Sequence, residues 1–238
     1  MKIALIGYGK MGQAIEKIAV ARHHEICCRI DAGEEAKFKS EEFINSDVAI
    51  EFTTPQSALS NYYKAFEANV PVVSGTTGWL EHLDELKELI RKENKTFFYA
   101  SNFSLGVNVF LSVNNYLAKL MNNFPEYNVR MDETHHIHKK DVPSGTAITL
   151  AEGIIQNLDS KDSWTLKQDA TSNQLLINAF REGEVPGRHT ITYDSNIDSI
   201  QITHDAKSRE GFALGAVIAA EFLKDKKGFY GMKDLLKF

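Results

Sequence analysis

Residues 2–12 read KIALIGYGKMG and join an apolar run, a glycine-rich turn and the start of a helical pattern. The run from Lys2 to Ile6 is typical of a buried parallel strand. Gly7, Gly9 and Gly12 follow in the spacing G-x-G-x-x-G. They allow a tight turn, a close approach of the backbone to a pyrophosphate, and packing of the helix on the strand. The helix that follows would offer unpaired N–H groups to phosphates.

A second strand, EICCRID, ends in Asp31. This acid lies 31 − 12 = 19 residues after Gly12, close to the spacing expected of a carboxylate that binds a ribose. A glycine-rich turn without a ligand is the alternative for the motif taken alone. Because a strand precedes the motif and a helix follows it, we predict a dinucleotide-binding site.

Strands and helices continue to alternate up to about residue 103. We expect further strands at 48–53, 70–74 and 96–100, and helices at 55–66 and 80–91. This alternation predicts an α/β fold with a Rossmann-type, doubly wound parallel sheet. Ligands bind beyond the carboxyl ends of such strands, where Gly75, Thr76, Thr77 and Asn102 could hold a nicotinamide. Ordinary loop chemistry is the alternative interpretation of these four residues.

The second half of the chain has a different pattern. A helix is expected at 107–121, followed by strand-like runs at 127–131, 175–181, 189–193 and 199–204. Because no helical pattern separates the last three runs, we predict an α+β domain with a mixed sheet. The polar span 157–173 is interpreted as a surface loop, and the apolar span 211–223 as a buried helix.

The overall composition is that of a globular protein. The chain has 238 residues, 43% of them apolar, and a net charge of −5, which gives no electrostatic reason to expect a nucleic-acid partner. The apolar run after Lys2 breaks at Gly7, so no secretory signal is expected. Seven Asn and Ser residues interrupt the uncharged span 96–118, so no membrane span is expected. Adjacent Cys27 and Cys28 favour reduced thiols and a cytoplasmic location.

Residues 133–146, ETHHIHKKDVPSGT, concentrate histidines and lysines. The histidine spacing is poor for a metal site, because neighbours on an extended chain diverge and no i, i+4 helical pair is present. A solvated loop is the plain alternative. However, Ser144 or Thr146 could cap the helix that follows, which would place an anion-binding N-terminus beside Lys139 and Lys140. Together with a nucleotide fold, this segment favours reduction of an anionic C=O or C=N compound.

The same segment resembles the signature of the 4-hydroxy-tetrahydrodipicolinate reductase family, also called dihydrodipicolinate reductase. The resemblance covers essentially the whole chain, through GYGKMG, EFTTP, SGTTG, ASNFSLGVN, REGEVPGRHT and HDAKSREGFALGAVIAA. It implies reduction of a cyclic imine dicarboxylate on the diaminopimelate route to lysine, by a homotetramer. It also implies a dinucleotide-binding domain at 1–104 and 212–238, and a substrate-binding and tetramerisation domain at 105–211.

The resemblance assigns expected roles to particular residues. His135 would be the acid/base residue, Lys139 the proton donor, and His136 a substrate-binding residue. The residues that would hold a substrate carboxylate are Ser144, Gly145 and Thr146. The resemblance also extends the expected cofactor site to Lys10, Met11, Ala100, Ser101 and Phe103.

Cofactor preference turns on Asp31. Family members that use NADPH well often carry an arginine after this acid, whereas Ala32 follows it here. We therefore expect NADH to be preferred and NADPH to be usable. Two alternative functions are another dehydrogenase of similar build, such as an aspartate or homoserine dehydrogenase, and a non-catalytic NAD-binding redox sensor. The first would not need the 133–146 segment, and the second would need a basic DNA-binding helix that the sequence does not show.

Overall fold

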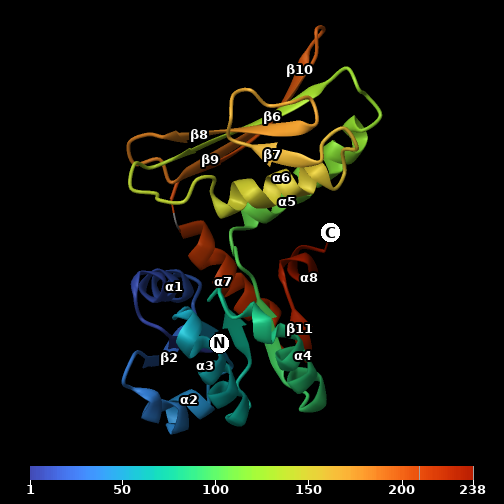
Figure 1. The fold of residues 1–238 in the computed structure, drawn as a ribbon. Coiled ribbons are helices and arrows are strands. Elements are labelled where there is room, and N and C mark those ends of the chain that lie inside the picture. Colours follow the sequence, from blue (N-terminus) through green and yellow to red (C-terminus); the bar gives the residue numbers. More distant parts are fainter. Residues whose placement is uncertain (209, 238) are drawn as a thin grey trace. The chain divides into compact units, whose positions relative to one another are not determined.

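The computed structural model describes residues 1–208 and 210–237 and divides into two compact units (Figure 1). One unit consists of Met1–Leu105 together with the C-terminal segment from Glu210, and the other begins at Gly106. Residues 209 and 238, which belong to the expected ranges 105–211 and 212–238, lie outside the described residues. Within the part of the chain that is described, no helix has the length and apolar character needed to cross a membrane.

A parallel sheet of six strands forms the centre of the first unit, in the order β11-β5-β4-β3-β1-β2. The strands are β1 (Lys2–Ile6), β2 (Glu25–Ile30), β3 (Val48–Glu51), β4 (Val72–Ser74), β5 (Thr96–Tyr99) and β11 (Gly228–Tyr230). The expected doubly wound sheet is therefore confirmed. The chain passes from β1 outward to β2 and then returns to β3, so the strand order reverses between β1 and β3. Ligands of such sheets bind at the carboxyl ends of the strands beside this reversal.

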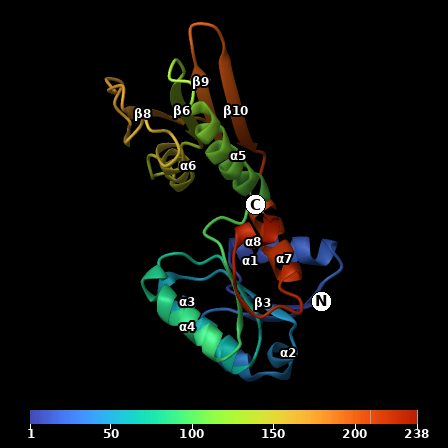
Figure 2. The ribbon, with the colours of Figure 1, turned by 90° about the vertical axis from the view of Figure 1, so that its right-hand side faces the viewer.

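Helices cover both faces of this sheet because its strands are apolar on both sides. On one face, α1 (Lys10–Ala21) and α7 (Glu210–Phe222) lie side by side (Figure 2). The other face carries α2 (Glu41–Ile44), α3 (Pro55–Glu67) and α4 (Leu83–Lys92). The short helices are η1 (Glu35–Lys39), η2 (Leu80–His82) and α8 (Met232–Leu236). Gly215 lets α7 pack closely against the backbone of Phe103, since a Cβ there would lie 1.8 Å from the Phe103 carbonyl oxygen.

The second unit contains a mixed sheet of five strands, in the order β10-β9-β6-β8-β7. These are β6 (Asn128–His135), β7 (Ser163–Thr165), β8 (Gln174–Arg181), β9 (Gly187–Asp194) and β10 (Ser199–Ala206). Strands β6, β7 and β8 pair in parallel, whereas β9 pairs antiparallel with both β6 and β10, so the expected mixed sheet is confirmed. Helices α5 (Leu105–Met121) and α6 (Gly145–Ile155) pack on one face (Figure 1).

The interpretation of the span 157–173 as a loop was wrong in part, because it contains β7. Trp164 packs against the core from this strand, and Lys161 is buried at 6% exposure. The Lys161 ammonium donates to Asn128 Oδ1 and to the carbonyl oxygens of Ser172 and Gln174, at 3.0, 2.7 and 3.1 Å. Three residues are too few to show the two-residue period of a strand, so these tertiary contacts define the element.

Candidate active site

The glycine-rich turn after β1 is held tightly by the sheet. The Gly7 N–H donates to the Ile30 carbonyl oxygen at 2.8 Å, and a Cβ on Gly7 would lie 2.1 Å from the Phe52 carbonyl oxygen. A Cβ on Gly12 would lie 2.3 Å from the Gly7 carbonyl oxygen. In contrast, among the described residues no atom other than those of its chain neighbours lies within 4 Å of the Cβ position of Gly9. The first and third glycines are therefore needed for packing, and the second leaves open space at the start of α1.

The N-terminus of α1 suits the phosphates of a dinucleotide. The helix begins at Lys10, directly after Gly9, and has no acidic residue in its first turn. The N–H groups of Lys10, Met11 and Gly12 have no acceptor inside the helix, because the first turn of an α-helix cannot provide one. These amides and the positive end of the helix dipole fit a pyrophosphate. Asp31 follows β2 and is exposed, as a ribose-binding acid would be.

The loops after β4 and β5 contain the other expected cofactor residues. Gly75 lies against the Phe52 ring, since a Cβ there would be 2.1 Å from that ring. In this loop Thr76 is buried and Thr77 is exposed. After β5, the Ala100 N–H donates to the Ser74 carbonyl oxygen at 3.3 Å.

The loop after β5 continues through Ser101, Asn102 and Phe103. Ser101 is exposed, and the Asn102 side-chain oxygen accepts a hydrogen bond from the Ser104 N–H at 2.9 Å. Phe103 is only 2% exposed, and its ring packs on those of Phe52 and Phe98. Phe103 can therefore offer a ligand little more than its backbone.

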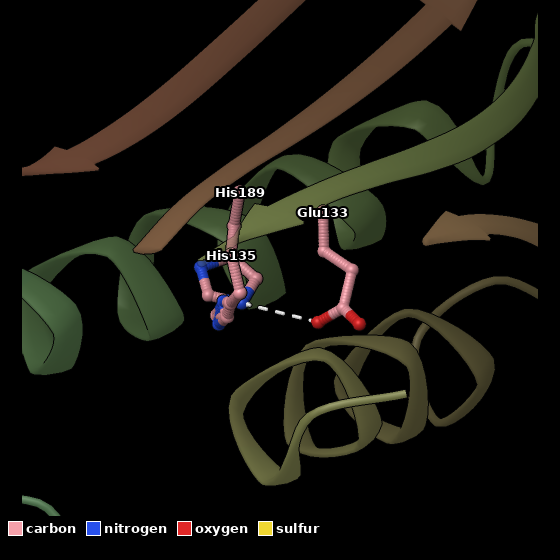
Figure 3. A group of neighbouring side chains, drawn as sticks. All are labelled: Glu133, His135 and His189. Atoms are coloured by element: carbon pink, nitrogen blue, oxygen red, sulfur yellow. Dashed lines mark ion pairs between the residues drawn. The ribbon is translucent and has the colours of Figure 1, made fainter. Parts of the chain in front are cut away.

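In the second unit, β6 points Glu133 and His135 toward the helix-covered face, and β9 places His189 beside them (Figure 3). All three side chains are buried. The His135 and His189 rings meet edge to face, with centroids 5.1 Å apart, and His189 Nε2 lies 3.7 Å from a Glu133 carboxylate oxygen. Gly187 leaves room for this arrangement, because a Cβ there would lie 3.2 Å from His135 Cε1.

Arg181, at the end of β8, joins this group to the loop that carries Lys139. Both of its terminal nitrogens lie 3.4 Å from Oε1 of Glu133. The guanidinium also donates to the carbonyl oxygens of Lys139 at 3.3 Å and Asp141 at 2.6 Å. We call Glu133, Arg181 and His189 the Glu133 cluster. The cluster fixes the backbone of the loop beside His135.

Burial lowers the pKa of His135 to about 4, and the Glu133 charge opposes this shift only in part. Near neutral pH the His135 ring is therefore uncharged. For Glu133, burial favours a higher pKa, but hydrogen bonds involving His189 and Ser144 outweigh it and lower the pKa to about 2. The site thus pairs an ionised carboxylate with a neutral imidazole.

The loop after β6 presents Lys139 and His136. The Lys139 ammonium lies 2.8 Å from an Asp141 carboxylate oxygen, and this contact lowers the pKa of Asp141. A backbone hydrogen bond of 3.1 Å from the Lys139 N–H to the His136 carbonyl oxygen closes the turn. His136 Nδ1 is buried and has no hydrogen-bond partner within residues 1–208 and 210–237. An unpaired buried nitrogen of this kind is costly, which suits a group that binds a ligand.

The N-terminus of α6 lies at the end of this loop. Ser144 is its N-cap: its hydroxyl accepts a hydrogen bond from the Ala147 N–H at 3.2 Å and lies 3.1 Å from His189 Nε2. The Ser144 N–H donates to Glu133, so the polar groups of Ser144 are already used inside the protein. The N–H groups of Gly145 and Thr146 have no acceptor in the helix. These two amides, rather than Ser144, are the groups that can receive a carboxylate.

Two family models match most of the chain. The N-terminal model of dihydrodipicolinate reductase matches residues 1–103, and the C-terminal model matches residues 106–236. The chain belongs to the dihydrodipicolinate reductase family. Membership confirms the resemblance of the 133–146 segment and, with it, the expected class of enzyme, a reductase.

Curated relatives and a solved structure agree with this family. A 4-hydroxy-tetrahydrodipicolinate reductase from Christiangramia forsetii is 50% identical over 236 residues, which cover 99% of this chain and 98% of that protein. One from Archaeoglobus fulgidus is 36% identical over 262 residues, with both chains fully covered. The dipicolinate-bound dihydrodipicolinate reductase of Paenisporosarcina sp. TG-14 has the same fold, with a TM-score of 0.78, 22% identity, and coverage of 98% of this chain and 99% of that one.

Two members of the Glu133 cluster, together with His135, raise the question of a metal site. Glu133, His135 and His189 each offer a ligand atom, and these atoms lie within 4.8 Å of one another. Two imidazoles and a carboxylate form a possible zinc site. However, the Glu133 oxygens already accept hydrogen bonds from Ser144 and Arg181, and the permanent charge of Arg181 repels a second cation. We therefore interpret the Glu133 cluster as a support for His135, in which Arg181 forms an ion pair with Glu133.

Sequence reasoning missed Glu133, Arg181 and His189 as members of the site. Glu133 lies at the start of the quoted histidine segment, and Arg181 and His189 lie in the motif REGEVPGRHT. Their only sequence signal was the presence of charged or polar residues in strands with buried neighbours. Pairing of His135 with Arg181 and of Glu133 with His189 across the sheet brings them together.

The buried His135 makes stability depend on pH. We expect the free energy of unfolding to fall as the pH drops from about 6.5 toward about 4, since the unfolded chain binds a proton that the folded chain does not. This contribution is fully present above pH 6.5, and its loss amounts to at most roughly 3 kcal/mol. Urea unfolding at pH 7 and pH 4.5 measures it. Between these two pH values, the free energy of unfolding of His135→Gln should fall less than that of the wild-type protein. The control His82→Gln, at a partly exposed position, should fall as much as the wild-type protein. The same pH dependence in both variants would contradict this account.

Proposed function

We propose that the protein reduces 4-hydroxy-tetrahydrodipicolinate to tetrahydrodipicolinate. The substrate is a cyclic imine dicarboxylate that loses water to form a C=C bond conjugated with its C=N bond, and addition of a hydride and a proton then removes this C=C bond. This reaction belongs to the diaminopimelate route to lysine. The observation that carries the proposal is the loop from His135 to Thr146, where a lysine, the buried His135 and the open amides of the α6 N-terminus lie together. A nicotinamide cofactor would supply the hydride, and the first unit has an α1 N-terminus suited to its phosphates.

The chain's own groups have to hold the dicarboxylate and supply one proton. Lys139 carries the mobile proton in this proposal, because an ammonium has three donors and the ring must gain one proton to balance the hydride. His135, which is uncharged near neutral pH, orients the substrate by hydrogen bonding. His136 offers its unpaired Nδ1, and the amides of Gly145 and Thr146 receive a substrate carboxylate.

An assay coupled to the preceding synthase of the pathway tests the proposal. The synthase delivers fresh substrate, and the fall in NADH absorbance measures its reduction. We expect oxidation of NADH only when the synthase is active. Binding of NADH without any oxidation in the presence of fresh substrate would reject the reaction.

We also propose that NADH is preferred over NADPH. Asp31 is exposed at the end of β2, where it can accept hydrogen bonds from ribose hydroxyls. Two of the nearby cations that could bind a 2′-phosphate, Arg29 and Lys37, already have partners. Arg29 is paired with Glu16, with its Nε donating to Oε2 at 2.9 Å, and Lys37 is paired with Glu34 at 2.6 Å. NADPH would therefore bring its 2′-phosphate toward the Asp31 carboxylate. Lys10, at the start of α1, is the cation nearby in sequence that is left to bind this phosphate.

Replacing Asp31 should change this preference. Two like charges about 4 Å apart repel by roughly 4 kcal/mol at an effective dielectric near 20, and solvent and salt reduce this to a preference of roughly tenfold. Asp31→Ala should lower kcat/KM for NADH and raise it for NADPH, so that the ratio moves toward one. Glu25→Ala, which removes an exposed carboxylate at the other end of the same strand, is the control. Equal use of both cofactors by the wild-type protein would refute the argument.

We propose further that the protein is a cytoplasmic homotetramer assembled through the mixed sheet. Helices α5 and α6 cover one face of that sheet, and no helix within residues 106–208 covers the other. The residues that point to the second face include Arg130, Asp132, Thr134, Asn178 and Thr190. Sedimentation equilibrium would give the mass of four chains if the proposal holds, and that of one chain if it does not.

A further inference from the structure

Glu51 is a buried carboxylate that the proposed chemistry does not use. It is the last residue of β3, and its exposure is 0%. Its hydrogen-bond partners are neutral, and burial raises its pKa while the surrounding hydroxyl groups act to lower it. An acid buried without a cationic partner is unfavourable, so its position at the carboxyl end of the parallel sheet calls for a reason.

Three hydroxyl groups donate hydrogen bonds to this carboxylate. Thr53 and Thr76 both donate to Oε1, the latter at 3.0 Å, and Ser74 donates to Oε2 at 2.7 Å. Thr53 follows β3, Ser74 ends β4, and Thr76 lies in the loop after β4. The side chain of Glu51 therefore links two neighbouring strands and the loops that leave them.

The direction of the hydrogen bonds to Glu51 follows from the second hydrogen bond that each hydroxyl group makes. Because each hydroxyl has a single hydrogen, a hydroxyl that donates to Glu51 must accept from its other partner. The Thr53 N–H donates to Thr76 Oγ1 at 2.8 Å, and the Tyr62 hydroxyl lies 2.7 Å from Ser74 Oγ, where it acts as the donor. All donors in the network point inward, toward the carboxylate.

Further contacts make the two loops one packed unit. The Gly75 N–H donates to the Glu51 carbonyl oxygen at 3.0 Å, and the Trp79 indole N–H donates to the Thr76 carbonyl oxygen at 2.7 Å. The Phe52 ring fills the space beside Gly75. In the absence of the carboxylate, Thr53, Ser74 and Thr76 would have to find other acceptors, and the two loops would lose their common anchor.

We propose that Glu51 is a positioning residue for the nicotinamide half of the cofactor, which acts by holding the loops 52–55 and 75–77 in one arrangement. The inference rests on the proposed function, in which Gly75, Thr76 and Thr77 lie against the nicotinamide. The pyrophosphate site at the start of α1 is a separate site formed by backbone amides. Replacement of Glu51 should therefore weaken the binding of NADH and leave the binding of a ligand without the nicotinamide unchanged.

The test compares the dissociation constants of NADH and ADP-ribose, measured by calorimetry on the full chain. ADP-ribose keeps the adenosine, the pyrophosphate and one further ribose but has no nicotinamide ring. Glu51→Ala removes both carboxylate oxygens, which accept three hydrogen bonds. It should weaken the binding of NADH by about tenfold to hundredfold, the usual effect of losing hydrogen bonds to a charged group. Binding of ADP-ribose should change by less than about twofold, an effect smaller than a single lost hydrogen bond.

Glu51→Gln keeps the shape and one acceptor oxygen, so its loss of NADH affinity should lie between wild type and Glu51→Ala. It also serves if the alanine variant does not fold. Glu25→Gln, on an exposed position of the same sheet, is the matched control and should bind both ligands as wild type does. Equal weakening of NADH and ADP-ribose in the Gln variant, or unchanged NADH binding, would overturn the role of Glu51. A wild-type protein that binds neither ligand would overturn the proposed function as well.

Discussion

Lys139→Met is expected to lower kcat by about 10²–10⁴, the usual effect of removing a positioned proton donor. Methionine keeps most of the length of the side chain and removes only the ammonium. The Lys139 ammonium is held 2.8 Å from Asp141, and its backbone carbonyl is held by Arg181. Because the loss affects the proton-transfer step, kcat and kcat/KM should fall together while the dissociation constant of NADH stays unchanged.

Lys140→Met is the matched control for this prediction. Lys140 is the next residue along the same loop, and its side chain is exposed. Its replacement removes the same charge and should leave kcat within about twofold, because exposed groups away from the reaction contribute little to it. If Lys139→Met turns over as fast as Lys140→Met, the interpretation of residues 133–146 as a solvated loop gains support.

His135→Ala should also depress kcat strongly, as expected of the second residue assigned to catalysis.

Arg181→Met is expected to destabilise the second unit by about 3 kcal/mol and to depress turnover as well. Glu133 has no exposed side-chain surface, so removal of Arg181 leaves a buried carboxylate without its cation. The loss also frees the carbonyl oxygens of Lys139 and Asp141, which accept hydrogen bonds at 3.3 and 2.6 Å. The loop that positions Lys139 should then move, which lowers kcat even in the folded protein.

Arg188→Met provides the control for Arg181. It removes an arginine from β9, which lies on the other side of β6 from β8. The Arg188 side chain is half exposed and lies 3.4 Å from Asp205. Exposed ion pairs contribute about 0–1 kcal/mol, so this variant should unfold at nearly the wild-type urea concentration. Equal shifts of the urea midpoint for Arg181→Met and Arg188→Met would show that the contact with Glu133 stabilises nothing. Glu133→Gln, which removes the charge but keeps the shape, should lose less stability than Arg181→Met.

Local patterns were sufficient for the strand, turn and helix with which the first unit begins. The strand Lys2–Ile6, the glycine turn and the helix through Ala21 were all expected, and the structure has β1 and α1 at these positions. The reason is that apolar periodicity and glycine spacing express steric requirements of neighbours in the chain. Short elements without such a period were missed, as with β7, β11 and α8, because each depends on contacts with distant residues.

The candidate site divides in the same way. The cluster of histidines and lysines at 133–146 is contiguous, so its chemistry could be predicted, and the family models confirm the enzyme class to which it belongs. The roles of His135, Lys139 and His136 stay predictions. Sequence could not show that Ser144 is buried and already bonded to Glu133, because that contact depends on how α6 docks on β6.

The amino-acid order alone was enough to predict the Rossmann-type fold and the reductase family, and both are confirmed. It also led to the phosphate-binding turn and to Asp31 as the residue that governs cofactor choice, which stay predictions. All of these depend on residues close together in the chain. The Glu133 cluster and the Glu51 network arise only in the folded protein. Strand register places His135 opposite Arg181 and Glu133 opposite His189, and parallel pairing brings Glu51 beside Ser74. Register is set by the packing of whole sheets. Burial then raises the pKa of Glu51, whereas hydrogen bonds involving His189 and Ser144 lower the pKa of Glu133.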